Sequence, residues 1–235
     1  MKLLLLLFSG LKFGKLLTTG GTMLLSVLAY SFVFGWWYAV GFVLLIFVHE
    51  MGHYIAARQR GLKVGAPTFI PFVGAWIELK DLPHDAETEA YVGIAGPLVG
   101  SIGALVCYWL GRTYDSQLLL ALAYSGFFLN LFNLIPLSPF DGGRVSAVIS
   151  PRLWLVGVPI LLALFLYNPS PLLILMAILA APKVMQALRG IRGQAEEAYY
   201  TVSAEARVQY AALYLGLAGF LAIMCHELHQ ELPRV

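Results

Sequence analysis

The sequence predicts an all-α polytopic membrane protein with about six or seven transmembrane helices, and two observations carry this prediction. The first is composition: 60% of the 235 residues are hydrophobic and 12% are charged, whereas soluble domains carry about 25% charged residues. The second is that the charges are unevenly placed. They leave windows of the length, about 20 apolar residues, that a helix needs to cross a bilayer. The net charge of +2 is too small to indicate nucleic-acid binding, and two cysteines predict no disulfide framework.

The apolar windows predict the helices in order. The expected spans lie near residues 16–34, 36–57, 90–111, 117–135, 153–167, 171–188 and 208–225. The fifth is short and contains Pro159, so it is expected to be tilted, bent or partly re-entrant. Residues 1–15 lack a convincing cleavage site and contain Lys12 and Lys15, so they are expected to form a retained interfacial segment.

The stretch PTFIPFVGAWIEL, residues 67–79, is apolar but too short to span, and Pro71 and Gly74 interrupt it. Its β-prone residues predict a short re-entrant loop or β-hairpin that dips into the cytosolic leaflet. An amphipathic loop resting on the membrane surface is the equal alternative. An exposed strand edge there could pair with an extended substrate, and the residues expected to contact it are Gly74, Trp76 and Ile77.

The placement of Lys and Arg predicts the orientation of the chain. With a cytosolic N-terminus, one side of the membrane receives 13 of the 15 Lys and Arg residues, and only Arg112 and Arg234 fall on the other. This bias predicts an integral multi-pass protein, most simply of a prokaryotic plasma membrane. No feature of the sequence predicts an oligomeric state.

The stretch HEMGH, residues 49–53, places costly ionisable groups inside an expected span, where such groups are rare and usually functional. His49 and His53 are four residues apart, so on a helix both imidazoles can reach one metal ion. Glu50 projects beside them and suits the metal's water rather than the metal. Three protein ligands and one water are the usual arrangement of catalytic zinc. The alternative is a pair of buried, hydrogen-bonded histidines or a proton relay.

A third ligand is offered by Asp141 in NLIPLSPFDGGR, residues 133–144. Pro136 and Pro139 predict irregular backbone, which lipid tolerates only where protein or a water-filled cavity surrounds it. By the charge bias, Asp141 lies at the same membrane level as the histidines. The residue types alone leave two readings equally open, a metal ligand or an N-cap at an interfacial turn.

These two motifs resemble those of the site-2 proteases, which are intramembrane zinc metalloproteases. HEMGH is similar to their H-E-x-x-H helix, and NLIP followed by FDGG, residues 133–143, is similar to their second signature. The resemblance is firm over residues 40–145. It implies one Zn²⁺ per chain held by His49, His53 and Asp141. It also implies Glu50 as the general base that activates the zinc-bound water.

The resemblance further implies that Asn133 stabilises the reacting carbonyl, the alternative being an asparagine that packs between helices. Neighbouring Asn130 has no such match and is expected to be a packing residue. Gly100, in AGPLVG, stands where many members have Asn.

The expected protein is a single membrane-embedded catalytic domain over residues 1–235, with a catalytic core at 40–145 and without a PDZ or C-terminal regulatory domain. Its expected partners are protein substrates with transmembrane segments and the lipid bilayer, with no nucleic acid. The rival function is a proton- or ion-coupled carrier that uses His49, Glu50 and Asp141.

Overall fold

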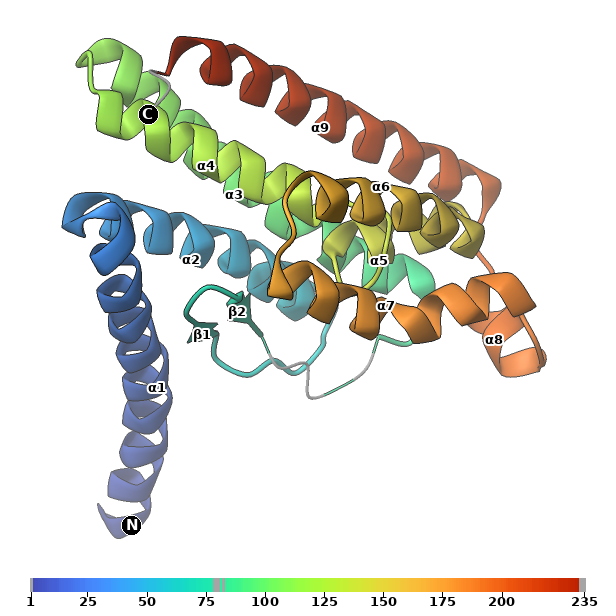
Figure 1. Cartoon of the computed structure of the whole chain (residues 1–235). Helices are drawn as coiled ribbons and strands as arrows, with labels where there is room; N and C mark the ends of the chain where they lie inside the picture. Colours follow the sequence, from blue (N-terminus) through green and yellow to red (C-terminus); the bar gives the residue numbers. More distant parts are fainter. Residues whose placement is uncertain (1, 78–80, 82, 233–235) are drawn as a thin grey trace.

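The computed structural model describes residues 2–77, 81 and 83–232, and it describes the backbone alone for residues 2–17 and for Trp76. The described residues are mostly helical (Figure 1). The helices and strands are α1 (Lys2–Phe34), α2 (Trp36–Gln59), β1 (Thr68–Ile70), β2 (Gly74–Trp76), α3 (Ala86–Thr113), α4 (Gln117–Asn133), α5 (Asp141–Ile149), η1 (Pro151–Leu153), α6 (Trp154–Tyr167), α7 (Pro171–Arg189), α8 (Gln194–Tyr199) and α9 (Ala204–Glu231).

Polar side chains mark where several of the helices begin. Asp85 accepts a hydrogen bond from the backbone N–H of Thr88 and so caps α3, whose first turn also carries Glu87 and Glu89. Serine side chains cap three more helices, namely Ser116 before α4, Ser170 before α7 and Ser203 before α9. These side chains satisfy amide groups that the first turn of a helix leaves unpaired.

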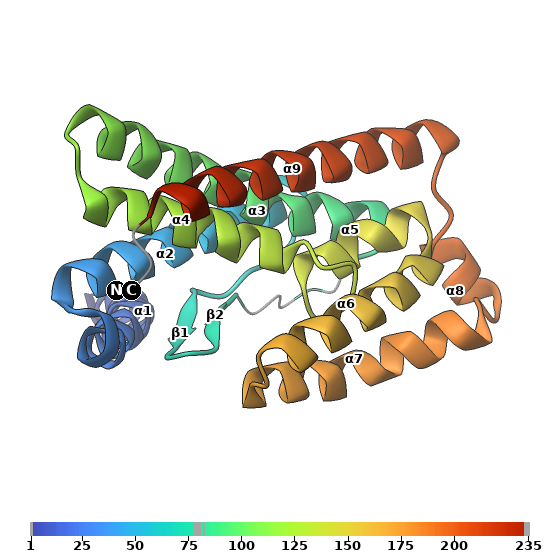
Figure 2. The ribbon, with the colours of Figure 1, turned by 45° about the horizontal axis from the view of Figure 1, so that its top comes forward.

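The centre of the fold is formed by α2, α3 and α4, with α3 packed against both of the others. The last helix, α9, lies along α4 and also contacts α3 and α5 (Figures 1 and 2). The short helix α5 is enclosed by α3, α9 and α6, and α6 and α7 pair with each other beside it. Segments far apart in the chain therefore surround α5.

The first helix leaves the bundle and projects away from it, with only its later part against α2 (Figure 1). Gly35, with φ at 83°, forms the sharp joint between α1 and α2, in a left-handed conformation that favours glycine. The expected interfacial segment, residues 1–15, lies in this first helix from Lys2 onward, and residue 1 is outside the described residues. Its interfacial position stays a prediction.

An antiparallel β-hairpin lies beside α1 and α2, where the sequence predicted a loop or hairpin. Phe69 pairs with Ala75, and the hairpin turn follows Ile70. The backbone N–H of Phe69 donates to Thr22 Oγ1, and Thr19 Oγ1 donates to the Pro67 carbonyl, so α1 covers the outer edge of β1. The strand β2 ends at Trp76, and Ile77 follows it.

In the part of the chain that the structure describes, four helices are long and apolar enough to cross a membrane: α2, α3, α7 and α9. Three shorter apolar helical stretches cover Thr18–Phe34, Gln117–Asn133 and Pro151–Tyr167. These seven segments correspond to the seven windows expected from the sequence. Large apolar side chains such as Phe32, Trp109 and Leu166 are exposed on them, as in a protein surrounded by lipid.

Candidate metal centre

The histidine motif lies in the second half of α2, on the face turned into the bundle. His49, Glu50 and His53 are all buried, with 4%, 7% and 7% of their surfaces exposed. The helix spacing brings the two imidazoles together at a centroid distance of 4.8 Å. Between them, Gly52 lets α2 approach α3, because a Cβ atom there would collide with the backbone of Ala95. The sequence-predicted helix and its shared face are therefore both present.

Asp141 is delivered by the irregular stretch between α4 and α5. Gly142 and Gly143 follow it, and a Cβ atom on either would collide with the backbone of residues 134–138. Only glycine permits this close crossing. Asp141 is the first residue of α5, whose N-cap is Phe140, and its carboxylate points to the histidines instead of capping the helix.

Side chains from other helices satisfy the backbone carbonyls of this region. Tyr214 of α9 donates its hydroxyl to the Leu134 carbonyl at 2.5 Å, and Trp154 of α6 donates Nε1–H to the Gly143 carbonyl at 2.7 Å. Both donors are buried. Because a buried carbonyl without a partner is costly, these two bonds fix the stretch that sets the position of Asp141.

Three ligand atoms converge in the bundle. Nε2 of His49 and Nε2 of His53 each lie 3.2 Å from Oδ2 of Asp141, and the two nitrogens are 3.1 Å apart. Two nitrogens and one carboxylate oxygen match the donor set of a catalytic zinc site with three protein ligands. The buried group could bind one metal ion.

The charge of this group favours a cation. Burial opposes ionisation of the Asp141 carboxyl, but attraction to His53 and hydrogen bonds from His49 and His53 outweigh it and hold the pKa of Asp141 below its usual range. Arg144 Nη1 lies 3.7 Å from the other oxygen, Oδ1, one helical turn away. The carboxylate is therefore anionic, as a metal ligand must be.

Glycines on one face of α3 make room for the site. Gly93, Gly96 and Gly100 follow one another at helical spacing. A Cβ atom on Gly93 would come within 2.9 Å of Arg144 Cβ. A Cβ atom on Gly96 would collide with the His53 ring, and one on Gly100 with the Asn130 amide. The backbone of α3 is thus one wall of the metal centre.

Both histidines are oriented through their remaining ring nitrogens. Nδ1 of His53 lies 2.7 Å from the Val92 carbonyl, and Nδ1 of His49 lies 2.8 Å from Oδ1 of Asn130. Sequence reasoning missed Asn130, which was expected only to pack. The spacing of Asn130 from His49 in the sequence does not predict their contact, because the contact depends on how α4 crosses α2.

The other predicted catalytic residues, Glu50 and Asn133, are close in sequence to residues of the cluster. Glu50 adjoins His49, and among the described residues its carboxylate has no hydrogen-bond partner. Asn133 is the last residue of α4 and donates Nδ2–H to the Leu129 carbonyl of its own helix at 3.0 Å. Its role toward a reacting carbonyl stays a prediction.

The residues expected to contact substrate lie in or just after β2. Gly74 begins the strand with φ at 125°, and Ile77 follows its end. The Trp76 side chain lies outside the described part of the structure.

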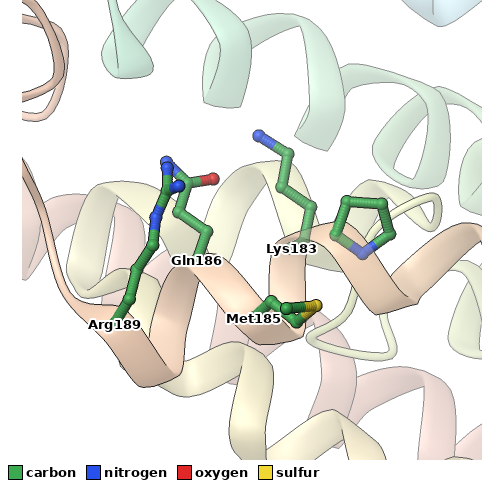
Figure 3. Close-up of a pocket in the computed structure, with 5 residues that line it drawn as sticks. Lys183, Met185, Gln186 and Arg189 are labelled. Carbon is green, nitrogen blue, oxygen red and sulfur yellow. The ribbon is translucent and has the colours of Figure 1, made fainter.

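The remaining histidines lie outside the cluster. His84 is exposed, His226 bonds to Gln230, and the His229 ring stacks on Tyr124. A separate hollow of about 520 Å³ runs along α7 (Figure 3). Its lining residues are Pro182, Lys183, Met185, Gln186 and Arg189, none of which was predicted as a site residue.

The chain is similar in sequence to several known proteins. The model of Peptidase family M50 matches residues 37–116, which include the histidine motif. Zinc metalloprotease MJ0392 of Methanocaldococcus jannaschii is 34% identical over 124 residues, covering 49% of this chain and 36% of that protein. Putative zinc metalloprotease MJ0611 of the same organism is 29% identical over 174 residues, covering 58% of this chain and 87% of that protein.

A probable chloroplastic zinc metalloprotease of Arabidopsis thaliana, EGY2, is 34% identical over 73 residues, covering 29% of this chain and 13% of that protein. The solved structure of a site-2 protease from Methanocaldococcus jannaschii aligns with a TM-score of 0.46 and 24% identity, covering 77% of this chain and 87% of that one. In the first curated relatives, the match spans about a third or less of their length. Over residues 37–116 the chain is therefore similar to peptidase family M50, and the curated relatives that it matches are named zinc metalloproteases.

Proposed function

We propose that this protein is an intramembrane zinc metalloprotease that hydrolyses a peptide bond within or near a transmembrane segment of a membrane-protein substrate, in regulated intramembrane proteolysis. The observation that carries the proposal is the convergence of His49 Nε2, His53 Nε2 and Asp141 Oδ2 inside a bundle of apolar helices. His49, His53 and Asp141 are the proposed ligands. A bound zinc ion would polarise the scissile carbonyl and lower the pKa of water to about 7.

Glu50 is the proposed general base. It takes a proton from the attacking water as the water oxygen bonds to the scissile carbon, and it then gives that proton to the departing nitrogen. Glu50 is buried as a residue and follows His49 in the helix, and its carboxylate has no hydrogen-bond partner among the described residues, which leaves it available to a water. The Asn133 amide is proposed to stabilise the negative charge that develops on the carbonyl oxygen.

The β-hairpin is the proposed docking edge for substrate. A transmembrane helix hides its carbonyls in its own hydrogen bonds, so a substrate must unwind before attack. The N–H of Phe69 points to Thr22 and away from β2, so Ala75, directly opposite in this antiparallel pair, points its own N–H and C=O outward. An extended substrate pairing with Ala75 would form a third strand. We propose that the hairpin is re-entrant, in the leaflet that holds the metal centre.

The proposed setting is the plasma membrane of a prokaryote, with six or seven spans and the metal centre toward the cytosol. The bias of Lys and Arg to one side of the expected spans supports this orientation. We further propose that residues 40–145 form the catalytic core of a single membrane-embedded domain that extends over residues 1–235.

The proposal is tested without knowing the natural substrate. The zinc-loaded protein is reconstituted into liposomes together with membrane proteins that were first solubilised in detergent. After incubation, new peptide termini are mapped by mass spectrometry. The proposal predicts new termini inside or beside apolar spans with the wild type and none with Glu50→Gln. A zinc-loaded wild type that yields no new termini but dissipates an imposed proton gradient would instead support a carrier.

A further inference from the structure

We propose that Asn130 is a positioning residue for the metal centre: it holds the His49 imidazole with Nε2 facing His53 and Asp141, and Gly100 provides the space its amide needs. The inference rests on the proposed zinc site. It assigns a role to a residue that the sequence motifs do not include, on a helix that contributes no proposed ligand.

The orientation of the Asn130 amide follows from its two hydrogen bonds. Its Nδ2 donates to the Gly126 carbonyl of α4 at 2.7 Å, so its Oδ1 is the atom that faces His49 Nδ1 at 2.8 Å. An amide oxygen only accepts hydrogen bonds. Nδ1 of His49 must therefore carry a proton, so the neutral imidazole that metal binding requires has its lone pair on Nε2, the atom that faces Asp141.

The amide is confined on its far side by α3. A Cβ atom on Gly100 would collide with Oδ1 of Asn130 and lie 2.9 Å from its Nδ2. Asn130 is only 1% exposed, so water does not compete for its hydrogen bonds. The amide is thus held between the backbone of α3 and its own helix, and it cannot turn away from His49 without losing both bonds.

The two histidines differ in the kind of group that orients their Nδ1 atoms. Nδ1 of His53 is oriented by the Val92 carbonyl, a backbone group that no substitution removes. The corresponding partner of His49 is a side chain, so its contribution can be measured. Such outer partners of ligating histidines typically contribute 10–100-fold to metal affinity.

The first test is zinc affinity, measured in detergent by competition with a chromophoric chelator. Asn130→Leu removes the acceptor while keeping a side chain branched at Cγ, and it is expected to weaken zinc binding about 10–100-fold. Asn133→Leu is the matched control for affinity, because Asn133 lies three residues away on the same helix and also bonds back to its own helix. Its zinc affinity is expected to equal that of the wild type.

A double-mutant cycle tests the role of Gly100. Gly100→Ala is expected to weaken zinc binding by displacing the Asn130 amide, but it should have no effect in an Asn130→Ala background, where the added methyl group fills vacated space. Equal effects of Gly100→Ala in both backgrounds would contradict the inference. This cycle decides the matter even if Asn130→Leu fails to fold.

A spectroscopic measurement separates positioning from general packing. The Co²⁺-substituted wild type is expected to show two slowly exchanging, paramagnetically shifted imidazole N–H resonances, one from each histidine. Asn130→Leu should lose the His49 resonance and keep that of His53. Retention of both resonances with wild-type zinc affinity would overturn this inference alone, whereas a wild type that binds no zinc would overturn the proposed function itself.

Discussion

His53 and Asp141 are 88 residues apart in the chain, and their Nε2 and Oδ2 atoms lie 3.2 Å apart inside the bundle. One comes from the second half of a long apolar helix and the other is the first residue of a nine-residue helix. The packing of α5 against α3 and the irregular stretch before it bring them together.

Gly96 is expected to be essential for the position of His53. Gly96→Ala would place a methyl group against the His53 ring. The ring would have to move, so zinc affinity should fall about tenfold or more, as when ligand orientation is lost. The measurement is the same chelator competition in detergent.

Gly103→Ala is the matched control. It lies on the same helix and faces α2, but the atoms nearest to its added Cβ would belong to the side chains of Val48 and Leu45, at 3.2 and 3.3 Å. It should cost stability by overpacking, about 1–3 kcal/mol, and leave zinc affinity unchanged. If both variants lost zinc equally, the effect of Gly96 would be one of helix packing.

Tyr214 is expected to stabilise the stretch that positions Asp141. Tyr214→Phe removes the hydroxyl that bonds to the buried Leu134 carbonyl and should cost about 1–3 kcal/mol, because that carbonyl is left without this donor. The expected result is a lower Tm and weaker zinc binding. Tyr114→Phe, at a residue that is 72% exposed, is the control and should leave both unchanged. An unaltered Tm in Tyr214→Phe would show that the hydrogen bond from α9 does not stabilise the stretch before Asp141.

The outer edge of β2 is expected to contribute to cleavage and not to the metal. Ala75→Pro removes the N–H that an added strand would use, so cleavage should be lost while zinc stays bound. Ala75→Ser keeps that N–H at similar size and should remain active. Substitution of Ile77 by proline is the less direct test, because Ile77 follows the strand. Full cleavage by Ala75→Pro would exclude strand pairing at this edge.

Removal of zinc is expected to lower the Tm only when the proposed ligands of the metal, including Asp141, are intact. When the free zinc concentration is 100 times the Kd of the site, binding adds about 2.7 kcal/mol to the free energy of unfolding. A chelator should therefore lower the Tm of the wild type, and added zinc should restore it. Asp141→Ala should show no such response to chelator. An identical response in both proteins would place the bound zinc elsewhere.

The pairing of the two histidines was within reach of the sequence because its motif is local, whereas the proposed role of Asp141 as a ligand rested on the resemblance to site-2 proteases. The i, i+4 spacing of His49 and His53 requires only a helix, and Pro136 and Pro139 predict the irregular backbone that the structure has between α4 and α5. The apolar windows also match the helices, since span length is set by the bilayer. These features depend on residues close together in the chain.

The surroundings of the ligands were not predictable in this way. The contact between His49 and Asn130 and the fit of Gly96 around His53 depend on the register in which α2, α3 and α4 cross. No spacing along the chain encodes that register.

The central claim is that His49, His53 and Asp141 hold one catalytic zinc ion that works with Glu50. Its most direct test is zinc content per chain in the detergent-purified wild type, Glu50→Gln and Asp141→Ala, with cleavage assayed in parallel. The account predicts about one zinc per chain in the first two and little in the third, with cleavage by the wild type alone. Zinc content unchanged by the loss of Asp141, or an active Glu50→Gln, would contradict it.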